Sequence, residues 1–280
     1  MIVHVLGTAQ DGGYPHAGCK EDCCVNVWDE PSLHRLPTSI AVVDQKNKKI
    51  YLFDVTPNIK EQLHLLDHYN CELAGIFITH AHIGHYVGLF DLGLEIMNTD
   101  NIPVHVMPRM KQFILDNQPM KQLIDNNNIK LIDMQNDEAI LFDNLSIIPF
   151  EVPHRNELSE TVGFRLLSSN KSIIYLPDID DWDGWDVNLD EFVMDNDILF
   201  LDGTFYVKNE IKSRDVSKIP HPEIIDTMQR LSSLSNQYKK RVHFIHLNHT
   251  NNVLRNNSDE FNDVIKQGFS LASENQKFEI

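Results

Sequence analysis

Apolar residues along the chain fall into short runs that predict strands. Most of the runs are nearly continuous stretches of Ile, Val, Leu and Phe, a pattern typical of strands that are buried on both faces. We predict strands at 2–7, 39–44, 49–55, 74–80, 103–107, 145–152, 161–167, 171–177, 197–203 and 241–247. Within these, 39–55 and 161–177 each contain two strands close enough to form a hairpin.

Other segments repeat their apolar positions with a helical period. This pattern predicts helices at 57–68, 87–97, 109–117, 222–234 and 258–266. Strands and helices alternate, and each half of the chain contains one hairpin. No stretch rich in Gly, Ser or Pro separates the halves, so we predict that residues 1–280 form one α/β domain.

Composition narrows the class of protein. A chain of 280 residues that is 42% hydrophobic can bury one large core, and it has no apolar run of about 18 residues that could span a membrane. Its first residues lack the pattern of a signal peptide, so we expect a cytoplasmic protein. The net charge of −17 argues against polymeric nucleic acid as a substrate. We expect a small-molecule or peptide substrate and no membrane partner, and we leave a homodimer open.

Three histidines stand at the end of one predicted strand. His80, His82 and His85 follow the apolar run IFIT, and Gly84 gives the chain freedom to turn between them. His80 and His82 are two residues apart, so in extended chain they point the same way. An isolated histidine is more often a core or capping residue. Three within six residues at a strand end instead predict a site for Zn, Fe, Mn or Ni.

The segment HAHIGH resembles the His-x-His-x-Asp-His signature of the metallo-β-lactamase superfamily. The resemblance implies a four-layer αββα sandwich, in which helices cover two mixed sheets. It also implies three further ligands, which occur in the same order along this chain: His154, the bridging Asp178, and His246.

One position departs from the signature, because Gly84 stands where the superfamily has an aspartate that binds the second metal. The first site keeps its ligands, which are His80, His82, His154 and Asp178. The second keeps only His85, Asp178 and His246. We therefore expect one or two zinc ions, the second of them weak, absent or completed by water. Iron or manganese would also suit three histidines and an aspartate.

Several segments resemble the coenzyme PQQ biosynthesis protein B family. They are LGTAQDGGYPHAGC at the start, SETVGF at 159–164, LFLDGTFY at 199–206 and FIHLNHTN at 244–251. The best-known members of that family tend to lose the first histidines, so this chain looks like a relative that kept more of the metal site.

Related cyclic phosphodiesterases carry a cysteine knuckle that holds a structural zinc. By that resemblance, Cys19, Cys23, Cys24 and His249 would bind one here, with His16 as a spare ligand. The alternative is two buried thiols and a free one, because adjacent Cys23 and Cys24 point apart in extended chain.

Other polar residues have both a functional and a structural interpretation. In the related phosphodiesterases a histidine in the region of His221 contacts the scissile phosphate or acts as general acid, whereas the alternative here is a surface histidine before a helix. Asp202 either orients a ligand histidine or is a turn residue. Trp182 either lines the mouth of a substrate pocket or covers the edge of the core, and we favour the second interpretation. We predict that His243 faces away from the metal. The remaining acidic residues after Asp178 are interpreted as solvated: Asp180, Asp181 and Asp183.

Three functions are compatible with these residues. The leading hypothesis is a metal-dependent hydrolase, in which metal-bound hydroxide attacks an ester or phosphodiester-type substrate. Asp178 would orient that hydroxide and accept its proton, and His221 would protonate the leaving group. The second is a mononuclear iron oxygenase or hydroxylase related to PQQ biosynthesis, which the loss of the carboxylate at Gly84 favours. The third is a non-catalytic cofactor carrier.

Overall fold

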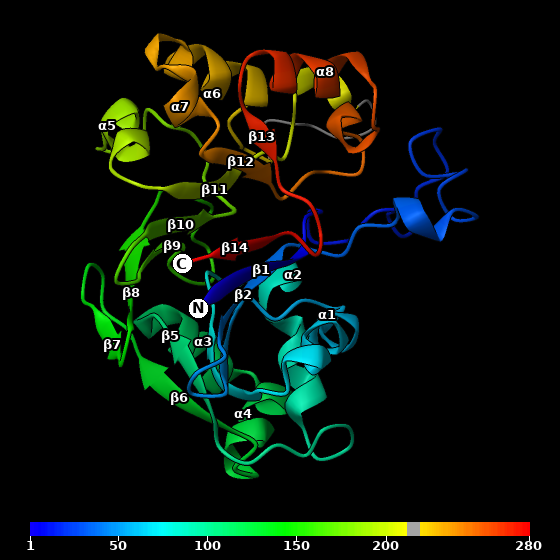
Figure 1. Ribbon diagram of the computed structural model, residues 1–280. Coiled ribbons are helices and arrows are strands. Elements are labelled where there is room, and N and C mark those ends of the chain that lie inside the picture. The colour runs from blue at the N-terminus through cyan, green and yellow to red at the C-terminus, as the bar shows by residue number, and fades with distance from the viewer. Residues whose placement is uncertain (212–218) are drawn as a thin grey trace.

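Two seven-stranded sheets form the centre of the computed structural model, which describes residues 1–211 and 219–280 (Figure 1). The first sheet has the order β14-β1-β2-β3-β4-β5-β6. Its strands are β1 (Ile2–Gly7), β2 (Ser39–Asp44), β3 (Lys49–Phe53), β4 (Glu72–Phe77), β5 (Ile102–Val106), β6 (Ile129–Asp133) and β14 (Lys277–Glu279). Strands β3 to β6 run parallel, while β14, β1, β2 and β3 pair antiparallel, so the sheet is mixed.

The second sheet is also mixed, and its strands have the order β13-β12-β11-β10-β9-β8-β7. Its strands are β7 (Ile140–Phe142), β8 (Leu145–Glu151), β9 (Val162–Leu167), β10 (Ser172–Leu176), β11 (Ile198–Asp202), β12 (Val242–Ile245) and β13 (Ser270–Leu271). Strands β7 to β10 pair antiparallel and β10 to β13 pair parallel. Both predicted hairpins are confirmed, as β2–β3 and β9–β10.

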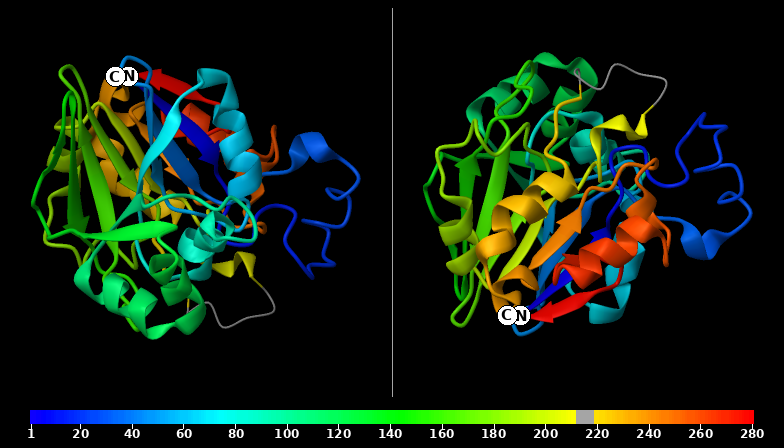
Figure 2. Two further views of the ribbon diagram at one scale, coloured as in Figure 1. Left: turned by 90° about the horizontal axis from the view of Figure 1, so that it is seen from below. Right: turned by 90° about the horizontal axis from the view of Figure 1, so that it is seen from above.

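Helices cover the outer face of each sheet. They are α1 (Ile59–Leu66), α2 (Ile83–Tyr86), α3 (Pro108–Asp116), α4 (Gln118–Asp125), α5 (Leu189–Met194), α6 (Ile224–Arg230), α7 (Asn236–Lys239) and α8 (Asp259–Lys266). Short 3-10 helices lie at Pro31–Leu33, Asp67–Tyr69, Val87–Leu92, Lys208–Glu210, Leu231–Ser233 and Asn252–Leu254. Helices α1, α3 and α4 pack on the first sheet, and α5, α6 and α8 pack on the second (Figures 1 and 2). No helix in the described ranges is long and apolar enough to cross a membrane.

The core between the sheets is aromatic. Phe53 and Phe77 of the first sheet contact Phe164 of the second, and Tyr175 lies against Phe53. All four side chains are buried. These contacts join the sheets into a sandwich, and the apolar clusters under the helices add the two outer layers. The predicted αββα architecture is confirmed.

The sequence pattern located the long elements better than the short ones. Each of the ten predicted strands lies within three residues of an observed one. Strands β6, β7, β13 and β14 and helices α2, α4, α5 and α7 were not predicted. Among these, β13 and β14 span only two and three residues, too few to show a period. The helix predicted at 87–97 is a 3-10 helix over Val87–Leu92, and it ends at Gly93.

Candidate metal centre

Three histidines converge where β4 and β8 end. Nε2 of His80 lies 2.8 Å from Nδ1 of His82, and Nε2 of His154 lies 3.2 Å from that same atom. Burial, followed by the charge of His85, holds the pKa of His80 well below its usual value. Burial, followed by the charge of His154, lowers the pKa of His82 to about 4. Both rings are therefore neutral at pH 7, the form that binds metals.

One carboxylate lies between this group and a second pair of histidines. Oδ1 of Asp178, just after β10, lies 3.6 Å from Nε2 of His154. Oδ2 of the same residue lies 3.2 Å from Nε2 of His85 and 3.4 Å from Nε2 of His246. Burial raises the pKa of Asp178, but the charges of His246 and His85 outweigh it and hold the pKa well below its usual range. The two oxygens of Asp178 thus face different groups of histidines.

The second pair of histidines faces another carboxylate, Asp11. Its Oδ1 lies 3.3 Å from Nε2 of His85 and 3.6 Å from Nε2 of His246. Burial lowers the pKa of His85, but the carboxylates of Asp54 and Asp178 outweigh it and hold the pKa well above its usual value. A positive charge is therefore favoured between these carboxylates. Asp11, which follows β1, is a carboxylate that the predicted set of His85, Asp178 and His246 did not include.

Each of these histidines, apart from His82, has its second ring nitrogen held by a neighbour. Nδ1 of His85 lies 2.8 Å from Oδ2 of Asp54, and Nδ1 of His154 lies 2.8 Å from Oδ1 of Asp180. The hydroxyl of Thr79 lies 2.9 Å from Nδ1 of His80, and the hydroxyl of Thr204 lies 2.9 Å from Nδ1 of His246. These partners aim Nε2 of each ring at the centre.

Most of these partners were missed by the sequence analysis. Asp54, Thr79 and Thr204 stand at strand ends, where polar residues are common, and nothing in the local pattern marks them. The interpretation of Asp180 as a solvated turn residue was wrong, because it also accepts a hydrogen bond from the backbone of Arg155. Asp183 is exposed and pairs with Arg230.

His221 lies in the site rather than on the surface. Its Nδ1 donates to Oδ2 of Asp202 at 2.7 Å, and both side chains are buried. A ring nitrogen of His221 lies within 4.8 Å of ligand atoms of Asp178 and His246. Burial lowers the pKa of His221, but the charge of Asp202 outweighs it and raises the pKa. Asp202 therefore orients His221, while Thr204 orients His246.

Two further residues behave as predicted. Trp182 is buried in the second sheet's outer core and donates from Nε1 to Oγ1 of Thr227 at 2.8 Å. His243 packs between Phe200 and Phe278, away from the histidine cluster.

The cysteines form a separate cluster in the long segment after β1. Sγ of Cys19 lies 3.5 Å from Sγ of Cys23, and ligand atoms of Cys19, Cys23, Cys24 and His249 all lie within 4.8 Å of one another. Neighbouring Cys23 and Cys24 both reach the cluster because the chain turns repeatedly here instead of running extended. His16, the spare candidate, stacks on His249 with ring centroids 4.3 Å apart and is outside this ligand group.

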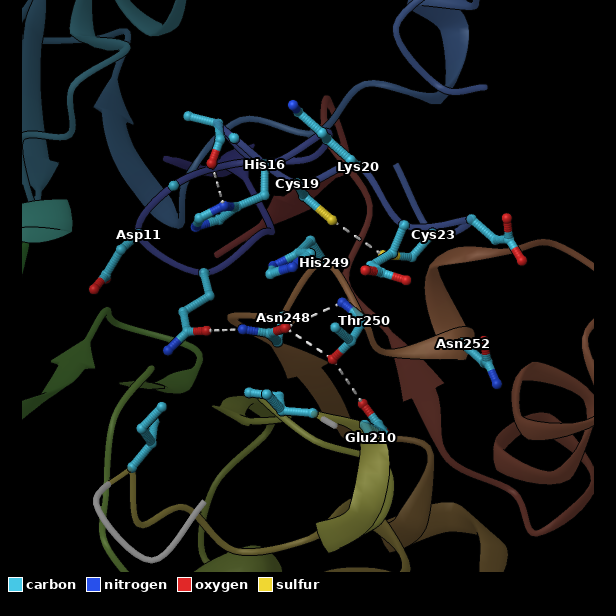
Figure 3. Close-up of a pocket in the computed structure, with 18 of the residues that line it drawn as sticks. Asp11, His16, Cys19, Lys20, Cys23, Glu210, Asn248, His249, Thr250 and Asn252 are labelled. Carbon is cyan, nitrogen blue, oxygen red and sulfur yellow. Dashed lines mark hydrogen bonds between the residues drawn. The ribbon is translucent and has the colours of Figure 1, made fainter. Parts of the chain in front are cut away.

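A pocket of about 1130 Å³ lies beside both clusters (Figure 3). Its walls come from residues 10–23, 207–211 and 248–255, with Ile219 at one side. In Figure 3, Asp11 and the cysteines lie on either side of His16 and His249. The lining is polar and apolar in about equal parts, with acidic Glu210 opposite basic Lys20 and with Arg255 as a second basic residue.

Comparisons with known proteins agree with this architecture. The chain is 23% identical over 305 residues to coenzyme PQQ synthesis protein B of Xanthomonas axonopodis pv. citri, with 97% of each chain covered. Zinc-bound PqqB from Methylobacterium extorquens superposes with a TM-score of 0.83 at 20% identity, over 100% of both chains. A diphosphatase from the PhnP family reaches a TM-score of 0.70 at 24% identity, over 100% of this chain and 96% of the other. The family model for the β-lactamase superfamily domain matches residues 50–247. The chain therefore belongs to the β-lactamase superfamily.

Proposed function

We propose that this chain is a zinc-dependent hydrolase, related to PqqB, that cleaves an ester or phosphodiester-type substrate. The observation that carries the proposal is the position of Asp178. Its two oxygens face different groups of histidines, which suits a carboxylate that bridges two metal ions. Imidazole and carboxylate are the ligands of catalytic zinc sites, so the residues fit this metal.

The chain's own residues supply the rest of the reaction. Zinc bound by these residues would polarise a substrate oxygen and lower the pKa of bound water toward ~7. Asp178 would orient the attacking water and accept its proton on a carboxylate oxygen. The histidine partners Asp54, Asp180 and Thr204 keep each Nε2 aimed at the centre, which preorganises the site.

His221 is placed to protonate the leaving group. Its Nδ1 is occupied by Asp202, so Nε2 is the atom free to face substrate beside Asp178 and His246. The buried Asp202 carboxylate favours the protonated ring, which is the form a general acid needs.

The adjacent pocket fits a small polar molecule or a short peptide segment. Its volume suits such a ligand, and its walls offer amide, hydroxyl and charged groups from Gln10, Lys20, Asn248 and Thr250. The oxygenase remains the alternative, and it draws on the relation to PQQ biosynthesis and on the missing carboxylate at position 84. The carboxylate of Asp11 beside His85 and His246 favours the hydrolase over it.

Hydrolysis of chromogenic substrates tests this proposal. The purified protein, stripped of metal and reloaded with zinc, should cleave bis(p-nitrophenyl) phosphate or p-nitrophenyl acetate, and chelation should abolish the activity. A His80→Ala/His82→Ala variant should lose both activity and the metal of the histidine centre, whereas His64→Ala, at an exposed histidine, should keep both. A protein that binds zinc at this centre but cleaves neither substrate class would contradict hydrolysis and favour the carrier hypothesis.

A further inference from the structure

Asp11 occupies the volume that a side chain at position 84 would need. A Cβ built on Gly84 would lie 2.3 Å from Oδ1 of Asp11 and 2.6 Å from its Cα. A real Cβ atom does not approach atoms to which it is not bonded this closely. A side chain at position 84 and the observed placement of Asp11 therefore exclude each other. In the superfamily signature, position 84 is the one that carries an aspartate.

The oxygen of Asp11 that faces the histidines is one of four possible ligand atoms that lie close together. Oδ1 of Asp11 and Oδ2 of Asp178 each lie 3.2–3.6 Å from Nε2 of both His85 and His246. These four distances are close to the separation of about 3.4 Å between neighbouring ligands that bind zinc at ~2.1 Å. All four atoms are buried and have no hydrogen-bond partner within the described part of the chain. Buried polar atoms without partners call for an ion or water between them.

The backbone holds Asp11 at this place. The amide of Gln10 donates to the carbonyl of Leu247 at 2.9 Å, and the amide of Leu247 donates to the carbonyl of Thr8 at 2.8 Å. These bonds tie the start of the turn after β1 to the residue that follows His246. Asp11 is thus held at the site by backbone hydrogen bonds between segments that are far apart in the sequence. About a third of its side chain remains exposed, and this part faces the pocket.

We propose that Asp11 is the carboxylate ligand of the second metal and takes the place of the signature aspartate, and that Gly84 is required to make room for it. The inference rests on the proposed metal centre. It makes the second site a four-residue site of Asp11, His85, Asp178 and His246. It also makes the segment that carries the cysteine cluster a direct part of that centre.

An exchange experiment tests the proposal by metal binding alone. Four proteins are compared: the wild type, Asp11→Asn, Gly84→Asp, and Asp11→Gly combined with Gly84→Asp. Each is stripped of metal, and zinc binding is measured by competition with a chromophoric chelator. Cobalt spectra separate thiolate-bound metal from metal at the histidine centre. Asp22→Asn, an exposed carboxylate in the same segment, is the matched control.

We expect Asp11→Asn to weaken the second metal by 10-fold or more, because a neutral amide replaces a charged ligand. Gly84→Asp alone should weaken it as well, since the new Cβ displaces Asp11. The exchange variant should recover the second metal to within about threefold of the wild type, and Asp22→Asn should match the wild type. Circular dichroism and thermal unfolding confirm that each variant folds.

Two results would overturn the relocation of the ligand. One is an Asp11→Asn protein that binds both metals as tightly as the wild type. The other is a folded exchange variant that still lacks the second metal. A wild-type protein that binds no metal outside the cysteine cluster would instead contradict the proposed metal centre, so the two failures are distinguishable.

Discussion

Nδ1 of His85 lies 2.8 Å from Oδ2 of Asp54, and this contact sets which nitrogen of the histidine faces the second metal group. Asp54 is fully buried and also accepts hydrogen bonds from the Thr79 backbone and hydroxyl and from the Tyr175 hydroxyl. Its carboxylate is therefore held from two strand ends of the first sheet and from the second sheet. Because Asp54 is fixed in place, it also fixes the orientation of the His85 ring, whose Nε2 can then bind a metal.

Asp54→Asn is expected to weaken the second metal by about 10–100-fold, because the amide cannot hold the His85 tautomer as a carboxylate does. Competitive zinc titration measures the effect. Asp44→Asn is the matched control, since Asp44 is another buried carboxylate but caps the turn between β2 and β3. Equal zinc affinity in the wild type and Asp54→Asn would show that Asp54 does not act through His85.

His221→Asn should slow the hydrolysis of substrates with poor leaving groups by about 10²–10⁴-fold. The same variant should affect p-nitrophenyl substrates much less, because that leaving group departs without a proton. Steady-state rates across a series of leaving groups provide the measurement. A uniform loss across the series would mean that His221 positions substrate or metal and donates no proton.

Cys19→Ser should reduce bound zinc by about one ion per chain and lower the unfolding temperature, because a structural zinc contributes directly to folding. Elemental analysis and calorimetry measure the two quantities. Metal at the histidine centre should remain. Cys71→Ser is the control, because Cys71 lies outside the ligand groups of the described residues and its thiol donates to the Tyr69 carbonyl at 3.4 Å. Unchanged zinc content in Cys19→Ser would argue for free thiols.

His243 should make the protein less stable in acid. Burial lowers its pKa from 6.5 to about 4, so between these values the unfolded chain binds a proton that the folded chain does not. Stability from this residue is fully present above pH 6.5 and declines as pH falls toward 4. A His243→Phe variant should therefore gain up to about 3 kcal/mol relative to the wild type from pH 7 to pH 4.

Chemical denaturation at several pH values measures this difference. The histidine centre loses metal in both proteins, so its contribution cancels. His64→Gln, at an exposed position, should show no such pH-dependent gain. If the difference in the free energy of unfolding between His243→Phe and the wild type does not change with pH, protonation of His243 does not destabilise the folded protein.

Local pattern was sufficient for most of the fold. Continuous apolar runs mark the central strands because those strands are buried on both faces, and histidine spacing after β4 marks the metal centre because three adjacent ligands share one short loop. His154, Asp178 and His246 were placed by resemblance and by order along the chain. In the structure they meet His80, His82 and His85 at the strand ends.

The sequence by itself thus determined the central strands and the histidine cluster, since both depend on residues near each other along the chain, while the sandwich was implied by the family resemblance. Tertiary structure alone decided the identity of the remaining groups. Asp11, Asp54 and Asp180 have no local signature, and each reaches its histidine through contacts between distant segments. Gly84 shows the limit most clearly. In the sequence, Gly84 marks the loss of a metal ligand. In the structure, Asp11 fills the space that a side chain at position 84 would need. Only the packing of distant segments shows which side chain fills such a space.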